Sequence, residues 1–169
     1  MEPALRPTLL RWQLHPAGAR LFHQERCVLD IVHQPDGSRQ FVLSERTYTL
    51  RNVGFWAPRT EIALADTVVL YVEHRGFFKS DQVVLSSGPR YTVAWTNTPL
   101  AKLALRDAAG VEVLSLRLAT EGGVHTETVL AAGQPLDGTA LLLLAFAYER
   151  FGAVIREQGG DGDLLLLVS

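Results

Sequence analysis

The segment 139–158, TALLLLAFAYERFGAVIREQ, decides the fold of this chain. From Ala140 to Tyr148 no polar residue interrupts any helical face. A helix that is apolar on every face must be enclosed by other elements. Asp137 is suited to cap its first turn, and Gly159-Gly160 to end it. We therefore expect a helix over about 138–158 that lies inside the rest of the protein.

The second half of this segment differs from the first because its apolar residues occupy one face only. Charged residues lie nearer the other face, which indicates that the helix emerges at the surface. Glu149 and Arg150 mark that change. They could form a buried charged pair at a pocket mouth, but unpaired buried charge is costly, so a solvated face is the favoured interpretation.

The sequence before the helix consists of short runs rich in Val, Ile, Thr, Tyr and Leu, separated by turn signals every eight to twelve residues or so. Turn residues join neighbouring runs at Pro35-Asp36-Gly37 and at 107–110. Tyr91, Val93 and Trp95 alternate with smaller or polar residues, as in an antiparallel strand with one buried face. The predicted strands are 5–14, 19–24, 26–33, 39–44, 46–53, 59–65, 67–74, 81–87, 89–97, 100–106, 111–119 and 124–131.

About twelve strands and one enclosed helix predict a mainly β fold, a closed antiparallel barrel around the C-terminal helix. An eight-stranded barrel holds only side chains, whereas a helix about 10 Å across needs a wider one. The alternative is a two-layer sandwich with the helix against one sheet. We expect a single domain over 1–169, with strands within 5–131 and an apolar tail at 159–169. In that tail, 163–168 reads as a final buried strand or a packed tail.

Composition excludes few functions. The net charge of −2 gives no electrostatic reason to expect nucleic acid. Residues 1–106 carry 13 basic and 9 acidic residues (+4), and residues 107–169 carry 3 and 9 (−6). The single cysteine, Cys27, lies in an apolar run and is expected to be a small buried hydrophobe. The N-terminus, MEPALRPTLLRW, has prolines and charges where a signal peptide needs a continuous apolar region. No apolar run reaches the length of a membrane span, so we expect a cytoplasmic protein.

The order of elements resembles the tubby-like superfamily, whose branches include the plant LURP-one-related proteins and the phospholipid scramblases. The shared features are strands with Asp-containing hairpin turns, then Pro135-Leu136-Asp137, then a hydrophobic C-terminal helix. The resemblance implies a twelve-stranded barrel around that helix. It also implies phosphoinositide binding through basic residues, as in tubby domains, or membrane and calcium association, as in scramblases. No residue here matches a site of that family, and the tail after Gly159 departs from its pattern.

Motifs for catalysis or for cofactors are absent from the sequence, so we expect neither a cofactor nor a metal. Its five histidines are dispersed without metal-ligand spacing and are expected to be surface or hydrogen-bonded residues. The stretch Gly159–Asp163 begins like a calcium-binding repeat but occurs once, so a helix stop is the favoured reading.

Two aromatic pairs are the most suggestive candidates for a binding surface. Phe55-Trp56 and Phe77-Phe78 each follow a glycine, and Arg59, Arg75 and Lys79 lie close by in the sequence, as does Arg51. If they point outward, apolar side chains beside cations suit a membrane interface or a protein partner. If they point inward, they close the barrel ends, and that is the interpretation we favour.

These observations predict a non-enzymatic binding or scaffold protein whose partner is a phospholipid, a membrane surface or another protein. The alternative is a carrier that holds a small hydrophobic ligand beside the helix. An enzyme is a third possibility with no motif in its favour, although catalytic sites need not be local in sequence. A binding function is to be sought on the loops at the barrel rim rather than on the helix.

Overall fold

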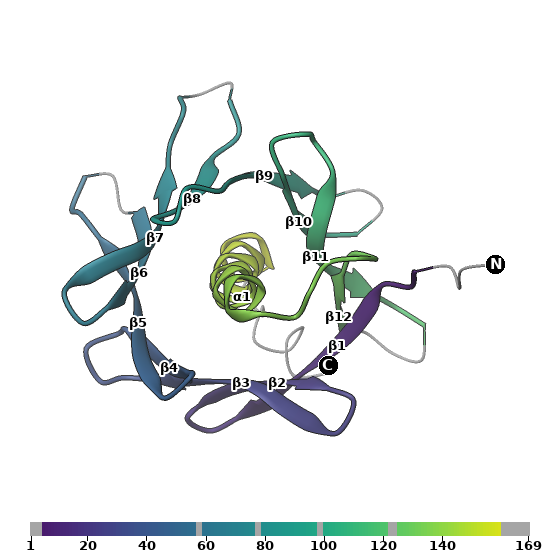
Figure 1. Ribbon diagram of the computed structural model, residues 1–169, viewed down its shortest axis with the longest axis horizontal. Helices are drawn as coiled ribbons and strands as arrows, with labels where there is room; N and C mark the ends of the chain where they lie inside the picture. Colours follow the sequence, from purple (N-terminus) through teal and green to yellow (C-terminus); the bar gives the residue numbers. More distant parts are fainter. Residues whose placement is uncertain (1–4, 57–58, 77–78, 98–99, 122–124, 160–169) are drawn as a thin grey trace.

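The computed structural model describes residues 5–56, 59–76, 79–97, 100–121 and 125–159. Twelve antiparallel strands form a closed barrel in which each strand pairs with its neighbours in sequence and β1 pairs with β12 (Figure 1). The strands are β1 (Thr8–His15), β2 (Gly18–His23), β3 (Arg26–His33), β4 (Arg39–Leu43), β5 (Arg46–Val53), β6 (Arg59–Leu64), β7 (Thr67–Glu73), β8 (Gln82–Leu85), β9 (Arg90–Thr96), β10 (Lys102–Arg106), β11 (Glu112–Ala119) and β12 (His125–Leu130). Helix α1 (Gly138–Gly159) follows β12.

The predicted closed barrel with a C-terminal helix is confirmed. Each of the twelve predicted strands corresponds to one observed strand, and the bounds of β3 and β5 coincide with the prediction. Other bounds differ by a few residues, as for β8, which covers Gln82–Leu85 instead of 81–87. Alternation along each strand and turn residues between strands are local properties, so the sequence displays them directly.

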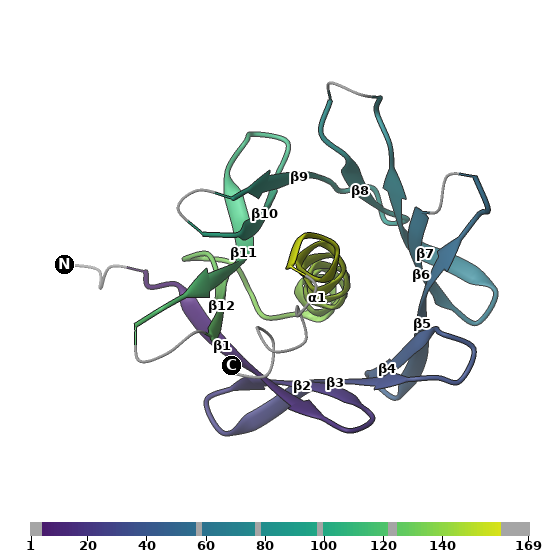
Figure 2. The same cartoon turned by 180° about the vertical axis from the view of Figure 1, so that it is seen from behind.

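The helix lies within the ring of strands when the barrel is seen along its axis from either side (Figures 1 and 2). It contacts β3, β6, β10 and β11, strands from different parts of the ring. Leu144, Phe146 and Phe151 are fully buried, whereas Leu141 and Leu142 in the first turns are only half-buried. Tyr148 stacks on Trp12 of β1, with ring centroids 4.3 Å apart. Helix and strands therefore share one hydrophobic core.

The start of α1 follows the expected capping pattern. The carboxylate oxygen Oδ1 of Asp137 accepts a hydrogen bond from the backbone N–H of Ala140 at 2.9 Å. Its backbone carbonyl accepts the first helical bond, from Leu141, at 3.0 Å. This N-cap satisfies a donor that has no partner inside the helix.

The two ends of the barrel differ in their connections. At the end where α1 begins, which we call the closed end, tight turns at 24–25, 44–45 and 65–66 join successive strands. Non-glycine residues there have positive φ, among them Ser44 at 49° and Glu45 at 65°. At the opposite end, which we call the rim, the connections include 34–38, 54–58 and 74–81. The second half of α1 reaches the rim, so the chain has longer segments there with which to form a binding surface.

The pairing between the neighbouring strands β3 and β4 is incomplete, and we call the boundary between these two strands the seam. β3 and β4 pair at Val32–Gln40 and His33–Arg39, near the rim, and the ladder stops there. Towards the closed end β3 continues to pair with β2, and β4 with β5. A cleft of about 440 Å³ opens on the outer wall at this seam, lined by Asp30, Val32, Gln34, Gln40, Phe41, Val42 and Thr47.

Candidate functional site at the barrel rim

The rim carries the residues that the sequence singled out. Phe55 and Trp56 lie in the β5–β6 connection, Arg59 begins β6, and Arg75 and Lys79 lie in the β7–β8 connection. All of these connections are at the same end of the barrel because the strands alternate in direction. Phe77 and Phe78 lie outside the described residues.

Phe55 and Trp56 point into solvent. The exposed fraction is 86% for Phe55 and 93% for Trp56, so the expectation that this pair turns inward is wrong. The two rings meet edge to face, with centroids 5.2 Å apart and an interplanar angle of 90°. The core is already filled by α1 and by inward strand residues, which leaves no place for two more rings at that loop. The result is an apolar pair that projects from the rim.

The arginines on either side of this pair are partly engaged with the barrel wall. Arg51 donates to the Glu61 carboxylate at 2.8 Å, and Arg59 lies 4.0 Å from the same carboxylate. The Arg59 guanidinium also lies over the ring of Tyr71, 5.5 Å from its centroid. Glu61 is buried beneath these groups. One carboxylate thus offsets one of the two arginine charges and fixes the direction of both side chains.

Arg75 and Lys79 are exposed, and their charged groups make no ion pair within the described part of the chain. The backbone N–H of Lys79 donates to the carbonyl of Gly76 at 3.4 Å. Gly76 has a φ of 101°, a conformation that side chains disfavour. The glycine therefore permits the turn that presents both cations at the rim.

Glu149 and Arg150 of α1 do not pair with each other, and Glu149 does not lie on a solvated face. Glu149 lies 3.4 Å from Arg39 at the start of β4, with only 12% of its side chain exposed. Arg150 donates a hydrogen bond to Oδ2 of Asp81 at 3.2 Å, and Oδ1 of the same carboxylate lies 2.9 Å from Nδ1 of His74. The helix is therefore tied to two different parts of the barrel. Sequence reasoning missed Asp81 and Arg39 because no local signal links them to the helix.

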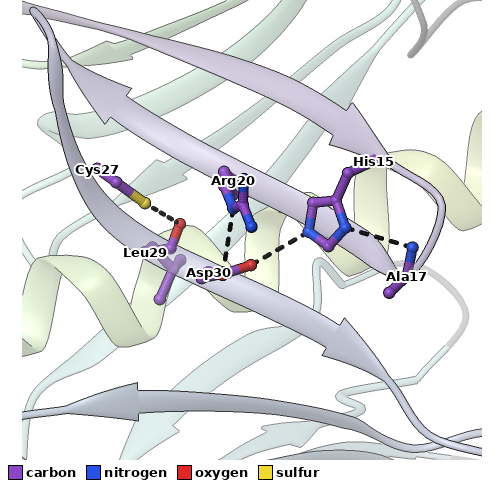
Figure 3. Close-up of polar contacts among 6 residues, drawn as sticks. All are labelled: His15, Ala17, Arg20, Cys27, Leu29 and Asp30. Atoms are coloured by element: carbon purple, nitrogen blue, oxygen red, sulfur yellow. Dashed lines mark hydrogen bonds and ion pairs between the residues drawn. The ribbon is translucent and has the colours of Figure 1, made fainter.

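A second polar cluster lies on the outer wall of β1, β2 and β3 (Figure 3). The Nε2 atom of His15 and the Nε atom of Arg20 contact the two oxygens of Asp30, at 3.1 and 3.3 Å. The backbone N–H of Ala17 donates to Nδ1 of His15 at 3.3 Å, which assigns the proton of the neutral ring to Nε2. This cluster has an acid and a base but no nucleophile in contact with them, so it is suited to joining strands.

The expectation of a buried Cys27 is wrong because this residue is exposed. Its thiol contacts the carbonyl of Leu29 at 3.4 Å (Figure 3). The register between β2 and β3 shifts at Leu21–Phe22, and Cys27 lies opposite Phe22 just beyond that shift. A bulge changes the face to which the following residues point, which an apolar run in the sequence does not reveal.

Metal binding receives no support from the described residues, in which no group of three His, Cys, Asp or Glu side chains could hold an ion. Gly159 is the last described residue of α1, so the predicted helix stop and residues 160–163 of the candidate calcium stretch lie outside the described residues. Across the residues with described structure, no helix has the length and apolarity required of a membrane span.

Comparison with known proteins supplies no assignment: no family model, no curated protein and no solved structure matches this chain.

Proposed function

We propose that this protein is a non-enzymatic binding module that attaches to an anionic membrane surface through its rim. The observation that carries the proposal is the exposure of Phe55 and Trp56, two adjacent aromatic side chains that project together. Aromatic residues favour the region where water meets lipid, because one part of the ring system can be apolar and another hydrated. An exposed apolar pair of this kind marks a site of contact with a membrane or with another protein.

The energies support a reversible interaction. A Phe or Trp side chain buries about 150–250 Å² when it is fully covered, which at about 25 cal/mol per Å² gives roughly 4–6 kcal/mol per ring as an upper bound. A basic residue near an anionic leaflet adds about 1 kcal/mol. Arg75 and Lys79 supply two such charges, and the arginines beside Glu61 supply one net charge more. Partial insertion of the two rings with these cations suffices for binding without a lipid anchor.

The filled interior supports this function over the carrier alternative. Fully buried side chains of strands and helix meet inside the barrel, among them Leu21, Ile62, Leu105, Leu144 and Phe146. A carrier of this kind would enclose its ligand inside the barrel, in the space that these side chains occupy. We also propose that the chain is a member of the tubby-like superfamily. The twelve-stranded barrel and the C-terminal helix support that membership.

Co-sedimentation with vesicles tests the role of the aromatic pair. The protein should pellet with vesicles of mixed phosphatidylserine and phosphatidylcholine, and less with phosphatidylcholine alone. Replacing both aromatic residues (Phe55→Ala with Trp56→Ala) should reduce the bound fraction about tenfold or more. Leu9→Ala is the matched control, because Leu9 is 69% exposed on the outer wall, away from the rim.

A charge-reversal pair separates the rim from general electrostatic attraction. Arg75→Glu with Lys79→Glu should abolish binding, whereas Arg26→Glu with Arg46→Glu, the same charge change at the closed end, should not. Equal losses in the two double variants would contradict a specific rim contact. If the unmodified protein leaves all vesicles unbound, the membrane proposal is wrong and the aromatic pair must be assigned to a protein partner.

A further inference from the structure

Besides the exposed pair Phe55 and Trp56, the rim carries a cavity with one polar and one apolar wall. It measures about 410 Å³ and lies between the β7–β8 connection, β9, β10 and α1. Its polar wall consists of Lys79, Ser80, Asp81 and Arg150, and its apolar wall of Val93, Trp95 and Leu103. No motif in the sequence indicates it, because the two walls come from separate parts of the chain.

The polar wall is held in place by Asp81. The backbone carbonyl of Asp81 accepts a hydrogen bond from the N–H of Val93 at 2.9 Å, which fixes the connection against β9. Its carboxylate contacts Arg150 through Oδ2 at 3.2 Å and His74 through Oδ1 at 2.9 Å. Both carboxylate oxygens are thus engaged, whereas an arginine has five N–H donors and this contact uses Nη2. Arg150 retains donors, and 37% of its side chain is exposed.

The charge of the wall favours an anion. Lys79 and Arg150 contribute two positive charges and Asp81 one negative charge, which leaves a net charge of +1 among the lining residues. Ser80 adds a hydroxyl donor beside Lys79. Ammonium, guanidinium and hydroxyl groups together match a carboxylate, which takes hydrogen bonds on both oxygens.

The apolar wall is rigid. The ring of Trp95 packs on Phe151 of α1 with centroids 5.7 Å apart, and its Nε1–H donates to Asn97 at 2.7 Å. Leu103 pairs with Trp95 across β9 and β10 and is fully buried. A fixed indole face next to aliphatic side chains provides a surface for a flat or aliphatic group at little cost in side-chain entropy.

We propose that this cavity binds a small organic carboxylic acid with an aromatic or aliphatic body. The carboxylate contacts Lys79, Ser80 and Arg150, and the body lies against the partly exposed side chains of Val93 and Trp95. This function is separate from attachment of the rim to a membrane and requires no lipid. It can therefore hold if vesicle binding fails, and can fail if vesicle binding holds.

Titration with 3-phenylpropionate, followed by NMR on ¹⁵N-labelled protein, tests the proposal. The three tryptophans give three indole N–H signals, which Trp→Phe variants assign. The signal of Trp95 should shift saturably, while those of Trp12 and Trp56 should not. For a ligand of about eleven heavy atoms the expected Kd is on the order of a few millimolar.

Variants and analogues identify the contacts. Lys79→Gln should weaken binding about fivefold to tenfold, because it removes one charged donor from an exposed position. Arg26→Gln at the closed end is the control and should leave the Kd unchanged. The neutral analogue 3-phenylpropionamide should bind at least about tenfold more weakly than the acid.

Three results would overturn the proposal. The first is a Trp95 signal that does not move at 3-phenylpropionate concentrations about tenfold above the expected Kd. The second is equal binding of acid and amide, which would mean that the cations play no part. The third is equal binding of acetate or glycerol 3-phosphate, which would identify a general oxyanion pocket, such as one for a lipid headgroup, with no use for the apolar wall.

Discussion

At the scale of single residues, the tight turns of the closed end hold side chains in an unfavourable conformation. Ser44 and Glu45 both have positive φ, as a two-residue turn between antiparallel strands requires. For an L-residue this region costs roughly 1–2 kcal/mol, whereas glycine occupies it freely. A substitution that relieves this strain in a turn of the closed end should therefore stabilise the protein.

We expect Glu45→Gly to raise the free energy of unfolding by about 0.5–1 kcal/mol, since relief of strain outweighs the added freedom of the unfolded chain. Urea unfolding measures the change. Ala109→Gly is the control, because Ala109 is not among the residues with positive φ, and it should destabilise slightly. A loss of stability in Glu45→Gly would show that the side chain makes a contact worth more than the strain.

Tyr91, also near the closed end, makes the stability of the folded protein depend on pH. Burial raises the pKa of its phenol above the ordinary value of 10.0, and the charges of Asp137 and Asp107 raise this pKa further. The folded state thus holds the proton more tightly than the unfolded state. This contribution to stability is complete below pH 10 and is lost as the pH rises through the pKa of the folded protein.

Urea unfolding at intervals between about pH 8 and pH 11.5 tests this assignment. The free energy of unfolding of the unmodified protein should fall more steeply above pH 10 than that of Tyr91→Phe, which has no phenol to ionise. Parallel curves for the two proteins would contradict the assignment.

At the scale of elements, α1 is the centre of the core. Phe146 is fully buried, whereas Leu142, one turn earlier, is half-buried. We expect Phe146→Ala to cost about 3–5 kcal/mol and Leu142→Ala clearly less, because the first leaves a cavity among packed side chains and the second faces partly outward. Denaturant unfolding of both variants measures the difference. Similar costs would mean that the two sides of the helix are equally enclosed.

The seam between β3 and β4 is a second property of elements. Because hydrogen-bonding direction alternates along a strand, the amides of Asp30 and Val42 face the seam, and those of Ile31 and Phe41 face β2 and β5. Beyond Val32–Gln40 the ladder supplies no partner across the seam. In hydrogen exchange, Asp30 and Val42 should exchange about tenfold to a hundredfold faster than Ile31 and Phe41. Equal protection of all four amides would show that the seam is closed in solution.

At the scale of the whole molecule, the barrel is closed by the pairing of its first strand, β1, with its last strand, β12. β1 pairs with β12 through Thr8–Leu130, Leu9–Val129 and Leu10–Thr128. Without these pairs the sheet has two open edges, and inward residues such as Leu10 are lost from the core. Closure of the ring is thus expected to be necessary for cooperative folding.

Deletion of residues 1–10 should lower the free energy of unfolding by more than about 3 kcal/mol and weaken the near-ultraviolet circular dichroism of the Trp12–Tyr148 stack. Deletion of residues 1–6, which ends before β1, is the control and should retain both. A cooperative transition of unchanged midpoint in the longer deletion would contradict the role of closure.

The sequence by itself determined the order of the elements and the class of fold. Strand alternation, turn residues and the apolar run at 140–148 are local, and a helix without a polar face requires a structure that surrounds it. The Asp137 cap was readable for the same reason. Exposed aromatic residues were identified as candidates, but their direction was not determined by the local sequence.

Only the tertiary structure decided where the side chains of the rim point and which charges meet. Arg150 and Asp81 are 69 residues apart in sequence, and Glu149 and Arg39 are farther apart still. A bulge exposed Cys27, and a filled core left Phe55 and Trp56 outside. Such outcomes depend on closure of the whole barrel, because a residue's neighbours across strands and its share of the core exist only once the ring has formed.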